Sequence, residues 1–597
     1  MGHKPISDYG LIGNMISSAL VGTDGSIDWC CLPRFDSPSV FAALLDDERG
    51  GRFQIRPSVP YEAVQSYLPD TNVLQTEFRT AGGRATVTDF MPCYQTIRYR
   101  VSRLNELHRL VDGREGRVPM EVIFEPRMDY GRGRTSLRAS KHGVMATGKA
   151  EGLALSAEIP FAIGEDRAVG SLIVEGGQGA GFVLRYGRAR PRSPGSLDLA
   201  GKLDRTTAYW KGQADGCFCP GPWRDHLVRS YLTLHLLTYS PTGAIIAAPT
   251  TSLPEEIGGV RNWDYRYTWL RDASLTMNAF LMLGHEEQAT GIANWIARAG
   301  RGVGMKTNIV FDLDFGEPPA EEELDHLGGY RDSRPVRVGN DAYRQVQLDV
   351  YGEVLEVAHS YFNTGGRITR RTWDVLKSFV NTAADEWQKP DSGIWEVRGG
   401  VHHFVHSKLM CWSALDRGIK IAERMGRKRN LEHWRKTAHE IREDILARGW
   451  NPQRRAFTQH YDTTALDASN LLMALFDFLP ISDPRVVSTI EQTMAELSTN
   501  GLLHRYRASE TSDGIAGSEG AFLWCSFWLA RNLLRLGMLE EAESLYQRLL
   551  GYGNHLGLFP EMVDPTTGEA MGNFPQALTH LAVIIAGLEL TQAMKDR

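Results

Sequence analysis

The chain has 597 residues, of which 42% are hydrophobic and 23% are charged, and its formal net charge is −6. The composition is that of a globular protein, and the length exceeds that of one ordinary domain, so we expect two or more domains. The negative net charge argues against a nucleic-acid partner, which would favour a basic surface.

Cysteine usage and hydropathy bear on the compartment. The seven cysteines are scattered and odd in number, and they include the adjacent Cys30 and Cys31 and the spaced pair Cys217 and Cys219. This is a poor disulfide framework and fits a reducing compartment. The N-terminus shows no apolar signal sequence, and no apolar stretch reaches the roughly 18 residues of a membrane span. We expect a cytoplasmic protein without a membrane partner, in which the apolar run 581–590 is a core helix.

Residues 1–195 carry the pattern of short antiparallel strands. Residues 72–80 and 84–90 alternate between apolar and polar side chains around a glycine turn, which predicts a β-hairpin. Similar short runs recur at 118–124, 153–159 and 181–186. This spacing predicts an antiparallel β-sandwich domain. The domain shows no catalytic constellation, so we expect it to cover or complete a site made elsewhere.

A change of period follows residues 191–196, which hold two prolines and a glycine and mark a domain boundary. Residues 196–221 read as a linker region with a helix over 197–213, and residues 222–597 are helical. Their apolar residues recur at helical spacing in nine segments: 223–239, 274–283, 287–299, 346–361, 408–425, 431–446, 522–536, 539–550 and 576–594. The chain is thus mainly α. Helix pairs of this kind form either a solenoid or a closed toroid, and without a repeat signature we expect the toroid.

The segment 261–272 follows neither a helical nor a strand pattern. Seven of its twelve residues carry an aromatic ring or a guanidinium group, and two are carboxylates. Flat aromatic faces match the C–H faces of a sugar ring, and Arg and Asp supply directional hydrogen bonds to hydroxyl groups. The segment therefore suggests carbohydrate binding. A buried aromatic corner with internal ion pairs is the alternative.

Two loops of the helical part each hold a glutamate suited to acid–base chemistry. Glu396 follows Trp395 in the glycine-flanked loop 391–400, and burial against an indole disfavours the charged form of a carboxyl group. Such a group is a plausible general acid. Glu561, in the loop 557–565 before the last long helix, is a plausible general base. A solvated loop glutamate is the alternative for each.

The distance between two such carboxyl groups decides the stereochemistry at the anomeric carbon of the sugar. A separation of about 6.5–9.5 Å admits a water molecule and gives inversion, whereas about 5 Å gives retention through a covalent intermediate.

Three motifs of the helical part occur together and in one order. They are Asp264-Tyr265-x-Tyr267-Thr268-Trp269-x-Arg271-Asp272, the pair Trp395-Glu396, and the loop of Glu561. The set resembles family 15 of the glycoside hydrolases, the glucoamylase family, with its bacterial trehalase and isomaltose-hydrolase branches. At the N-terminus, residues 6–13, 25–29 and 35–41 resemble the start of the sandwich domain that the bacterial branch adds.

The resemblance covers nearly the whole chain and implies an (α/α)6 toroid as the catalytic domain. It implies that Glu396 is the general acid that protonates the glycosidic oxygen and that Glu561 is the general base that activates water. Tyr265 matches a tyrosine that helps to hold this water. Further matching residues would grip or enclose the non-reducing glucose: Trp269, Arg271, Asp272, Trp395 and Arg505.

Two positions depart from the fungal glucoamylase pattern. Val397 follows the acid where those enzymes have a second acidic residue, and Met562 follows the base where they have glutamine. Both concern the leaving sugar, so the resemblance does not imply starch. We expect an inverting, exo-acting α-glucosidase that releases β-glucose from a small α-glucoside. The first candidate substrate is α,α-trehalose, and the alternative is isomaltose or a short oligosaccharide.

Two other classes of protein stay open. One is a phosphorylase on a similar toroid, which needs no base and is disfavoured by Glu561. The other is a silent sugar-binding protein, which the presence of both carboxylates disfavours.

His406 and Lys408 are expected at the edge of the pocket. His402, His403 and His406 lack the glutamate of an HExxH zinc motif, so we expect neither a metal nor a cofactor.

Overall fold

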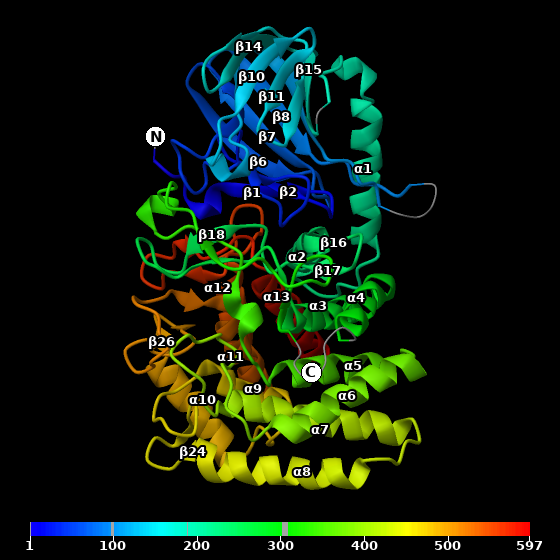
Figure 1. The fold of residues 1–597 in the computed structure, drawn as a ribbon, viewed down its shortest axis with the longest axis vertical. Coiled ribbons are helices and arrows are strands. Elements are labelled where there is room, and N and C mark those ends of the chain that lie inside the picture. The colour runs from blue at the N-terminus through cyan, green and yellow to red at the C-terminus, as the bar shows by residue number, and fades with distance from the viewer. Residues whose placement is uncertain (1, 97–100, 188, 301–307, 597) are drawn as a thin grey trace.

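The structure is a computed structural model that describes residues 2–96, 101–187, 189–300 and 308–596. A domain of β-strands lies at one end of the molecule and a domain of helices at the other (Figure 1). Helix α1 (Leu199–Asp215) runs along the side from the first domain towards the second.

In its described residues, the N-terminal domain is an antiparallel sheet of fifteen strands folded into two layers. Its path runs β1-β2-β3-β5-β9-β15-β12-β11-β10, and the other strands pair beside it. The bounds are β1 Tyr9–Gly13, β2 Ser18–Gly22, β3 Ser26–Cys31, β4 Ser39–Phe41, β5 Arg52–Pro57, β6 Tyr61–Tyr67, β7 Leu74–Thr80, β8 Gly83–Phe90, β9 Glu106–Glu125, β10 Ser136–Ser140, β11 Gly143–Thr147, β12 Gly152–Ser156, β13 Phe161–Ile163, β14 Ala168–Glu175 and β15 Gly179–Tyr186.

Strand β9 holds the two layers together. Its first half pairs with β8 and β15, and its second half pairs with β5 and β14. The predicted hairpin is confirmed, because β7 and β8 pair in register from Leu74 opposite Asp89 to Thr80 opposite Gly83. The antiparallel β domain predicted from the alternating pattern is therefore present.

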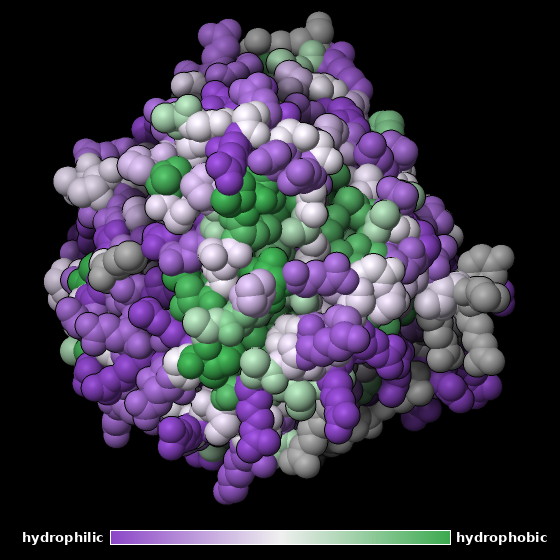
Figure 2. Space-filling view, turned by 90° about the horizontal axis from the view of Figure 1, so that it is seen from above, coloured by the Kyte–Doolittle hydropathy of each residue, from purple (hydrophilic) through white to green (hydrophobic). Residues whose placement is uncertain are grey.

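The far end of this domain presents an apolar area bordered by hydrophilic side chains (Figure 2). Strands β13 and β14 contribute exposed isoleucines to the surface, Ile163 and Ile173. Most other apolar side chains of the domain are buried, which is what the alternation along the strands predicts.

The C-terminal domain consists of helix pairs. The bounds are α2 Arg224–Leu237, α3 Leu270–Met282, α4 Glu286–Ala299, α5 Val350–Asn363, α6 Arg370–Glu386, α7 Val405–Arg424, α8 Leu431–Asp444, α9 Leu472–Leu475, α10 Pro484–Glu496, α11 Leu523–Arg535, α12 Leu539–Leu550 and α13 Ala577–Lys595. Helices α6, α9 and α10 were not among the nine predicted segments.

The inner helices close into a ring. Helix α3 packs on α5, α5 on α7, and α7 on the short 3-10 turn Ala468–Leu471 that leads into α9. Helix α9 packs on α11, α11 on α13, and α13 on α3 again. The contact between α13 and α3 excludes an open solenoid. The predicted (α/α)6 toroid is confirmed.

By length and composition alone, helix α13 could span a membrane. In the structure, however, 67% of the apolar 18-residue stretch within it is buried. Its residues from Ala577 to Gly587 are buried without a break. A helix that is apolar on all sides belongs at the centre of a fold. It packs against α2, α3, α11 and α12, as expected for a core helix of the ring.

The two domains meet at the middle of the segment 261–272. Arg266 is fully buried and pairs with Asp264, and its Nη1 group donates to the backbone carbonyl of Ser37 at 2.8 Å. Its guanidinium group lies 5.8 Å from the ring of Trp29, whose indole N–H donates to the carbonyl of Pro249 at 2.7 Å. The alternative of a buried corner with an internal ion pair is therefore correct for this part of the segment.

Candidate active site

Two adjacent cavities lie among the loops of the helical domain. We call the larger one, of about 410 Å³, the outer chamber and the smaller one, of about 50 Å³, the inner chamber. Four side chains line both and so mark the boundary between them: Tyr265, Trp395, Glu396 and Arg505. The outer volume lies within the range of about 300–1,000 Å³ typical of small-ligand sites.

The expectation that the β domain covers or completes this site is wrong. In the described part of the chain, all residues that line the two chambers belong to the helical domain. The β domain instead holds the segment 261–272 from behind through Arg266.

The segment 261–272 supplies one donor to each predicted catalytic glutamate. It runs through two short strands, β19 (Asn262–Asp264) and β20 (Thr268–Trp269), into the first turn of α3. The hydroxyl of Tyr265 donates to Oε1 of Glu561 at 2.6 Å, and the indole N–H of Trp269 donates to Oε1 of Glu396 at 2.6 Å. The two rings contact each other with centroids 5.6 Å apart. One rigid aromatic pair therefore positions both carboxyl groups.

Glu396 sits in a tight loop with a left-handed backbone conformation, φ +59°. Its N–H donates to the carbonyl of Gly393, and its own carbonyl accepts from the side-chain amide of Gln345 at 3.1 Å. A left-handed glutamate persists only where its surroundings hold it, and such strain concentrates at functional sites. Because Trp269 donates to Oε1, Oε2 is the oxygen left for the predicted proton transfer.

Glu561 is buried, with 1% of its surface exposed. Its Oε2 accepts from the backbone N–H of Asn573 at 3.1 Å, and Tyr265 donates to Oε1. Burial raises the pKa of Glu561, and the hydrogen bond from Tyr265 and the charge of Arg505 oppose that rise. A buried carboxylate with two donors is a fixed acceptor for a proton from water, as the role of general base requires.

Gly572 offers a test of how tightly the carboxylate of Glu561 is held. Its φ is +73°, and a Cβ atom added there would lie 2.4 Å from Oε2 of Glu561. We expect Gly572→Ala to displace the carboxylate and to lower kcat at least tenfold, because small misplacements of a catalytic group are costly.

The matched control is Gly568→Ala in the same hairpin. Gly568 has φ +75°, but the nearest atom to its added Cβ is a carbon of Tyr552 at 3.8 Å. Both variants should lose about 1–2 kcal/mol of stability to the left-handed backbone. Only Gly572→Ala should lose turnover, so equal kcat values in the two variants would contradict the proposed position of the base.

Arg271 and Asp272 lie in the first turn of α3 at the floor of the inner chamber. Arg271 donates to Oδ2 of Asp272 at 3.1 Å and to the carbonyl of Ile394 at 3.1 Å. Burial raises the pKa of Asp272 to about 6. Among the residues that the structure describes, Oδ1 of Asp272 has no hydrogen-bond partner, so it is available to a ligand hydroxyl.

Two buried acids at the start of α5 interact electrostatically with Arg271: Asp349, the residue just before the helix, and Glu353 in its first turn. Burial raises the pKa of Asp349 to about 7 and that of Glu353 to about 8. Because these values lie above those of the unfolded chain, the stability from the neutral forms is complete below about pH 4 and is lost as the pH rises through 7–8. We expect the melting temperature to fall between pH 5 and pH 8.

The change that isolates this effect is Asp349→Asn, which removes one titrating proton without changing size. Its melting temperature should fall less over the same pH interval, by an amount equivalent to about 1.4 kcal/mol for each pKa unit removed. Asp374→Asn, at an exposed position of α6, serves as the control and should follow the wild type. Identical pH profiles for all three proteins would contradict the assignment.

Trp395 forms a wall of both chambers and is held from behind. Its indole N–H donates to both carboxylate oxygens of Asp467 at 3.0 Å, and its ring packs near Phe522 and Trp528. Asp467 is itself buried. Trp524 adds a further aromatic wall to the inner chamber. The predicted walls Trp269 and Trp395 therefore both line the inner chamber, beside charged side chains such as Arg271 and Glu561.

Arg505 lines both chambers, as predicted for a sugar-binding arginine. Several of its N–H groups, however, already donate to carboxylates of the protein. Its Nε donates to Glu519 at 3.0 Å, and its Nη2 donates to Oε2 of Glu255 at 2.9 Å. Its guanidinium group also lies 5.5 Å from the ring of Trp395.

His406 and Lys408 line neither chamber, which corrects their predicted place at the pocket edge. Lys408 donates to the backbone carbonyl of Lys389. His406 is buried, and burial together with the charge of Arg271 lowers its pKa to about 3. It is a neutral packing group on α7.

Several lining residues escaped sequence reasoning: Glu255, Trp263, Gln345, Arg398 and Trp524. Among 72 acidic residues, nothing in the flanks of Glu255 distinguishes it. Trp263 and Arg398 stack at 4.2 Å although 135 positions separate them (398 − 263), a contact that only the fold reveals. The aromatic density of the segment 261–272 was the available signal for Trp263.

Both domains match known protein families. Residues 221–543 match the profile of the family described as Glycosyl hydrolases family 15, and residues 2–187 match the one described as Trehalase-like, N-terminal. The chain is 39% identical to a trehalase of Mycolicibacterium smegmatis over 99% of this chain and 92% of that protein. It is 34% identical to a trehalase of Thermoplasma volcanium, over 100% of this chain and 95% of that one.

The fold has a counterpart among solved structures. A bacterial glucoamylase complexed with acarbose superposes with a TM-score of 0.72 at 13% identity, over 99% of this chain and 94% of that chain. The family profile spans more than half of the sequence, and the full-length relatives exceed 30% identity. The chain therefore belongs to family 15 of the glycosyl hydrolases.

Proposed function

We propose that this protein hydrolyses α,α-trehalose with inversion, using Glu396 as general acid and Glu561 as general base. The observation that carries the proposal is that both glutamates line the inner chamber and are each fixed by a donor from the segment 261–272. The similarity to trehalases over the whole chain supports the choice of disaccharide.

The reaction follows from the positions of these groups. One glucose reaches from the outer chamber into the inner one, where Arg271 and Asp272 bind hydroxyls and the Trp395 and Trp524 rings contact its apolar faces. Glu396, at the boundary of the chambers, protonates the glycosidic oxygen as the C–O bond breaks. Glu561 accepts a proton from a water molecule. The oxygen of this water attacks the anomeric carbon of that glucose from the face opposite to the leaving oxygen. The second glucose departs into the outer chamber.

Proton NMR of the first products tests this proposal. Inversion at one carbon of trehalose yields one β-glucose and one α-glucose in equal initial amounts, whereas retention yields α-glucose alone. The same assay on isomaltose and maltose, with and without phosphate, separates the alternatives. Only α-glucose from trehalose would exclude the water-inverting mechanism. Turnover that requires phosphate and yields a sugar phosphate would instead indicate a phosphorylase.

The proposed compartment is the cytoplasm. All seven cysteines are free thiols in the structure, including Cys217 and Cys219, which are two residues apart. A protein that keeps such thiols unpaired suits a reducing environment.

A further inference from the structure

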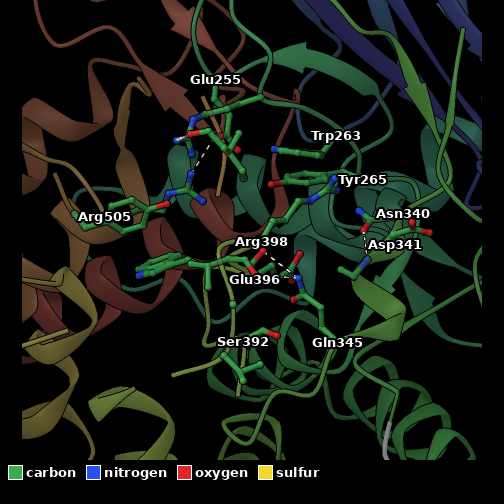
Figure 3. A pocket seen from close by; sticks show the side chains of 18 residues that line it. Glu255, Trp263, Tyr265, Asn340, Asp341, Gln345, Ser392, Glu396, Arg398 and Arg505 are labelled. Atoms are coloured by element: carbon green, nitrogen blue, oxygen red, sulfur yellow. Dashed lines mark hydrogen bonds and ion pairs between the residues drawn. The ribbon is translucent and has the colours of Figure 1, made fainter. Parts of the chain in front are cut away.

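Glu255 is a third carboxyl group beside the two assigned to catalysis. It directly follows strand β18 (Thr251–Pro254) and lines the outer chamber with Glu396 and Tyr265 (Figure 3). Only 1% of its surface is exposed. The acid–base chemistry described above does not use it, so its presence in the wall of the chamber needs another explanation.

The contacts of Glu255 fix its position but leave one oxygen unused. Its N–H donates to the carbonyl of Arg261 at 3.1 Å, and its carbonyl accepts from the N–H of Gly520 at 2.9 Å. In the side chain, Oε2 accepts from Arg505 at 2.9 Å. Oε1 has no hydrogen-bond partner in the described ranges of the chain. A buried carboxyl oxygen without a partner is costly, and a ligand hydroxyl would remove that cost.

The charges around Glu255 favour its neutral form. Arg505 is shared with Glu519, and Arg261 pairs with Asp513 at 2.8 Å, so two arginines already face two other carboxylates. Burial raises the pKa of Glu255 to about 8, the charge of Arg505 opposes the rise, and the charges of Glu561 and Glu519 add to it. In this neutral form Oε2 still accepts from Arg505, so the proton would be on Oε1, which could then both donate and accept.

We propose that Glu255 determines which leaving groups are accepted, with its Oε1 hydrogen-bonded to a hydroxyl of the sugar that departs into the outer chamber. The inference rests on the proposed function, because it takes Glu396 to lie at the bond that is cleaved. The placement agrees with this role: Glu255 lines only the outer chamber, whereas Glu561 lines only the inner one. Val397 lines the same outer chamber without a polar side chain to offer.

The test compares two substrates that share the glucosyl group but differ in the leaving group. Trehalose leaves a glucose, whereas α-glucosyl fluoride leaves a fluoride ion with no hydroxyl to recognise. Glu255→Leu removes the hydrogen-bonding group at similar size. We expect it to lower kcat/KM for trehalose by about 10- to 100-fold, and to change the value for α-glucosyl fluoride by less than about threefold.

Glu255→Gln keeps a neutral donor and acceptor, and we expect its kcat/KM for trehalose to stay within about fivefold of the wild type at pH 6–7. Glu256→Gln is the matched control, since the neighbouring Glu256 lines neither chamber and binds Ser518 instead. Melting temperatures establish that each variant is folded.

Three results would overturn the inference. A parallel fall for both substrates in Glu255→Leu would assign Glu255 to the support of Glu561, and unchanged trehalose hydrolysis would remove it from the site. An equal loss of kcat/KM for trehalose in Glu255→Gln and Glu255→Leu would show that a neutral hydrogen-bonding side chain at this position does not recognise the leaving sugar. The proposed function fails separately, if the wild-type protein hydrolyses α-glucosyl fluoride but not trehalose. In that case kcat/KM for isomaltose is compared with kcat/KM for α-glucosyl fluoride, and Glu255→Leu is expected to lower only the former.

Discussion

Glu396→Gln is expected to keep the fold and to lower kcat for trehalose by about 100- to 10,000-fold, the usual contribution of a general acid. The amide oxygen of glutamine can still accept the hydrogen bond that Trp269 donates at 2.6 Å, so the loop should not move. What is lost is the proton for the glycosidic oxygen. Initial rates of glucose release, together with the melting temperature, measure both parts of this expectation.

The leaving group provides the control for this variant. Fluoride departs from α-glucosyl fluoride without prior protonation, so Glu396→Gln should retain far more of its activity on this substrate than on trehalose. Equal losses on the two substrates would mean that Glu396 has another role, such as binding the glucosyl group. Near-normal hydrolysis of trehalose would remove it from catalysis altogether.

Glu561→Gln should lower kcat by about 100- to 10,000-fold on both substrates, because activation of water is needed whichever group leaves. The fold should tolerate this change. The amide oxygen can accept from the N–H of Asn573, and the Tyr265 hydroxyl can rotate to accept from the new NH₂ group. The measurement is again kcat on trehalose and on α-glucosyl fluoride.

The two substrates thus distinguish the two glutamates: loss of the acid mainly affects trehalose, whereas loss of the base affects both substrates. A Glu561→Gln variant that still hydrolyses α-glucosyl fluoride at the wild-type rate would contradict its role as base. A second check uses Glu561→Ala with added azide, a small anion that fits the space left by the carboxylate. Attack from that side gives β-glucosyl azide, and an α-configured azide would place the base on the wrong face.

The residues that sequence reasoning found are those that lie in dense local motifs. Tyr265, Trp269, Arg271 and Asp272 share one short segment, and Glu396 adjoins a tryptophan in a glycine-rich loop. In the structure these residues, together with Glu561, line the inner chamber. Their local chemistry left alternatives open, and the order and spacing of the motifs, which carry the family resemblance, selected these residues.

The residues that it missed depend on contacts between distant positions. Glu255 is 250 positions from Arg505, and Trp263 is 135 positions from Arg398. Neither pairing leaves a periodic or spaced pattern in the chain. The error over Lys408 has a local cause, since residues two apart on a helix point to different sides, so His406 and Lys408 could not both face one pocket.

The fold shows the same division between local and distant information. The toroid was predictable because most of its helices bury one face and so show apolar residues at helical spacing. Strand β9 was seen only in part, as the run 118–124, because Gly113 and Gly116 near its middle look like a turn. Pairing with β8 carries the strand through these glycines, from Gly83 opposite Gly116 to Ala85 opposite Gly113, and that requires the whole sheet.

The burial of Arg266 between the domains has a consequence for how this protein can be divided. The same short segment supplies Tyr265 to Glu561, Trp269 to Glu396 and Arg266 to the β domain. Removing the β domain would expose a guanidinium group that now lies between Trp29 and Tyr130, and the segment would lose its backing. The β domain is thus not a detachable module, and heat inactivation and loosening of the domain interface should coincide.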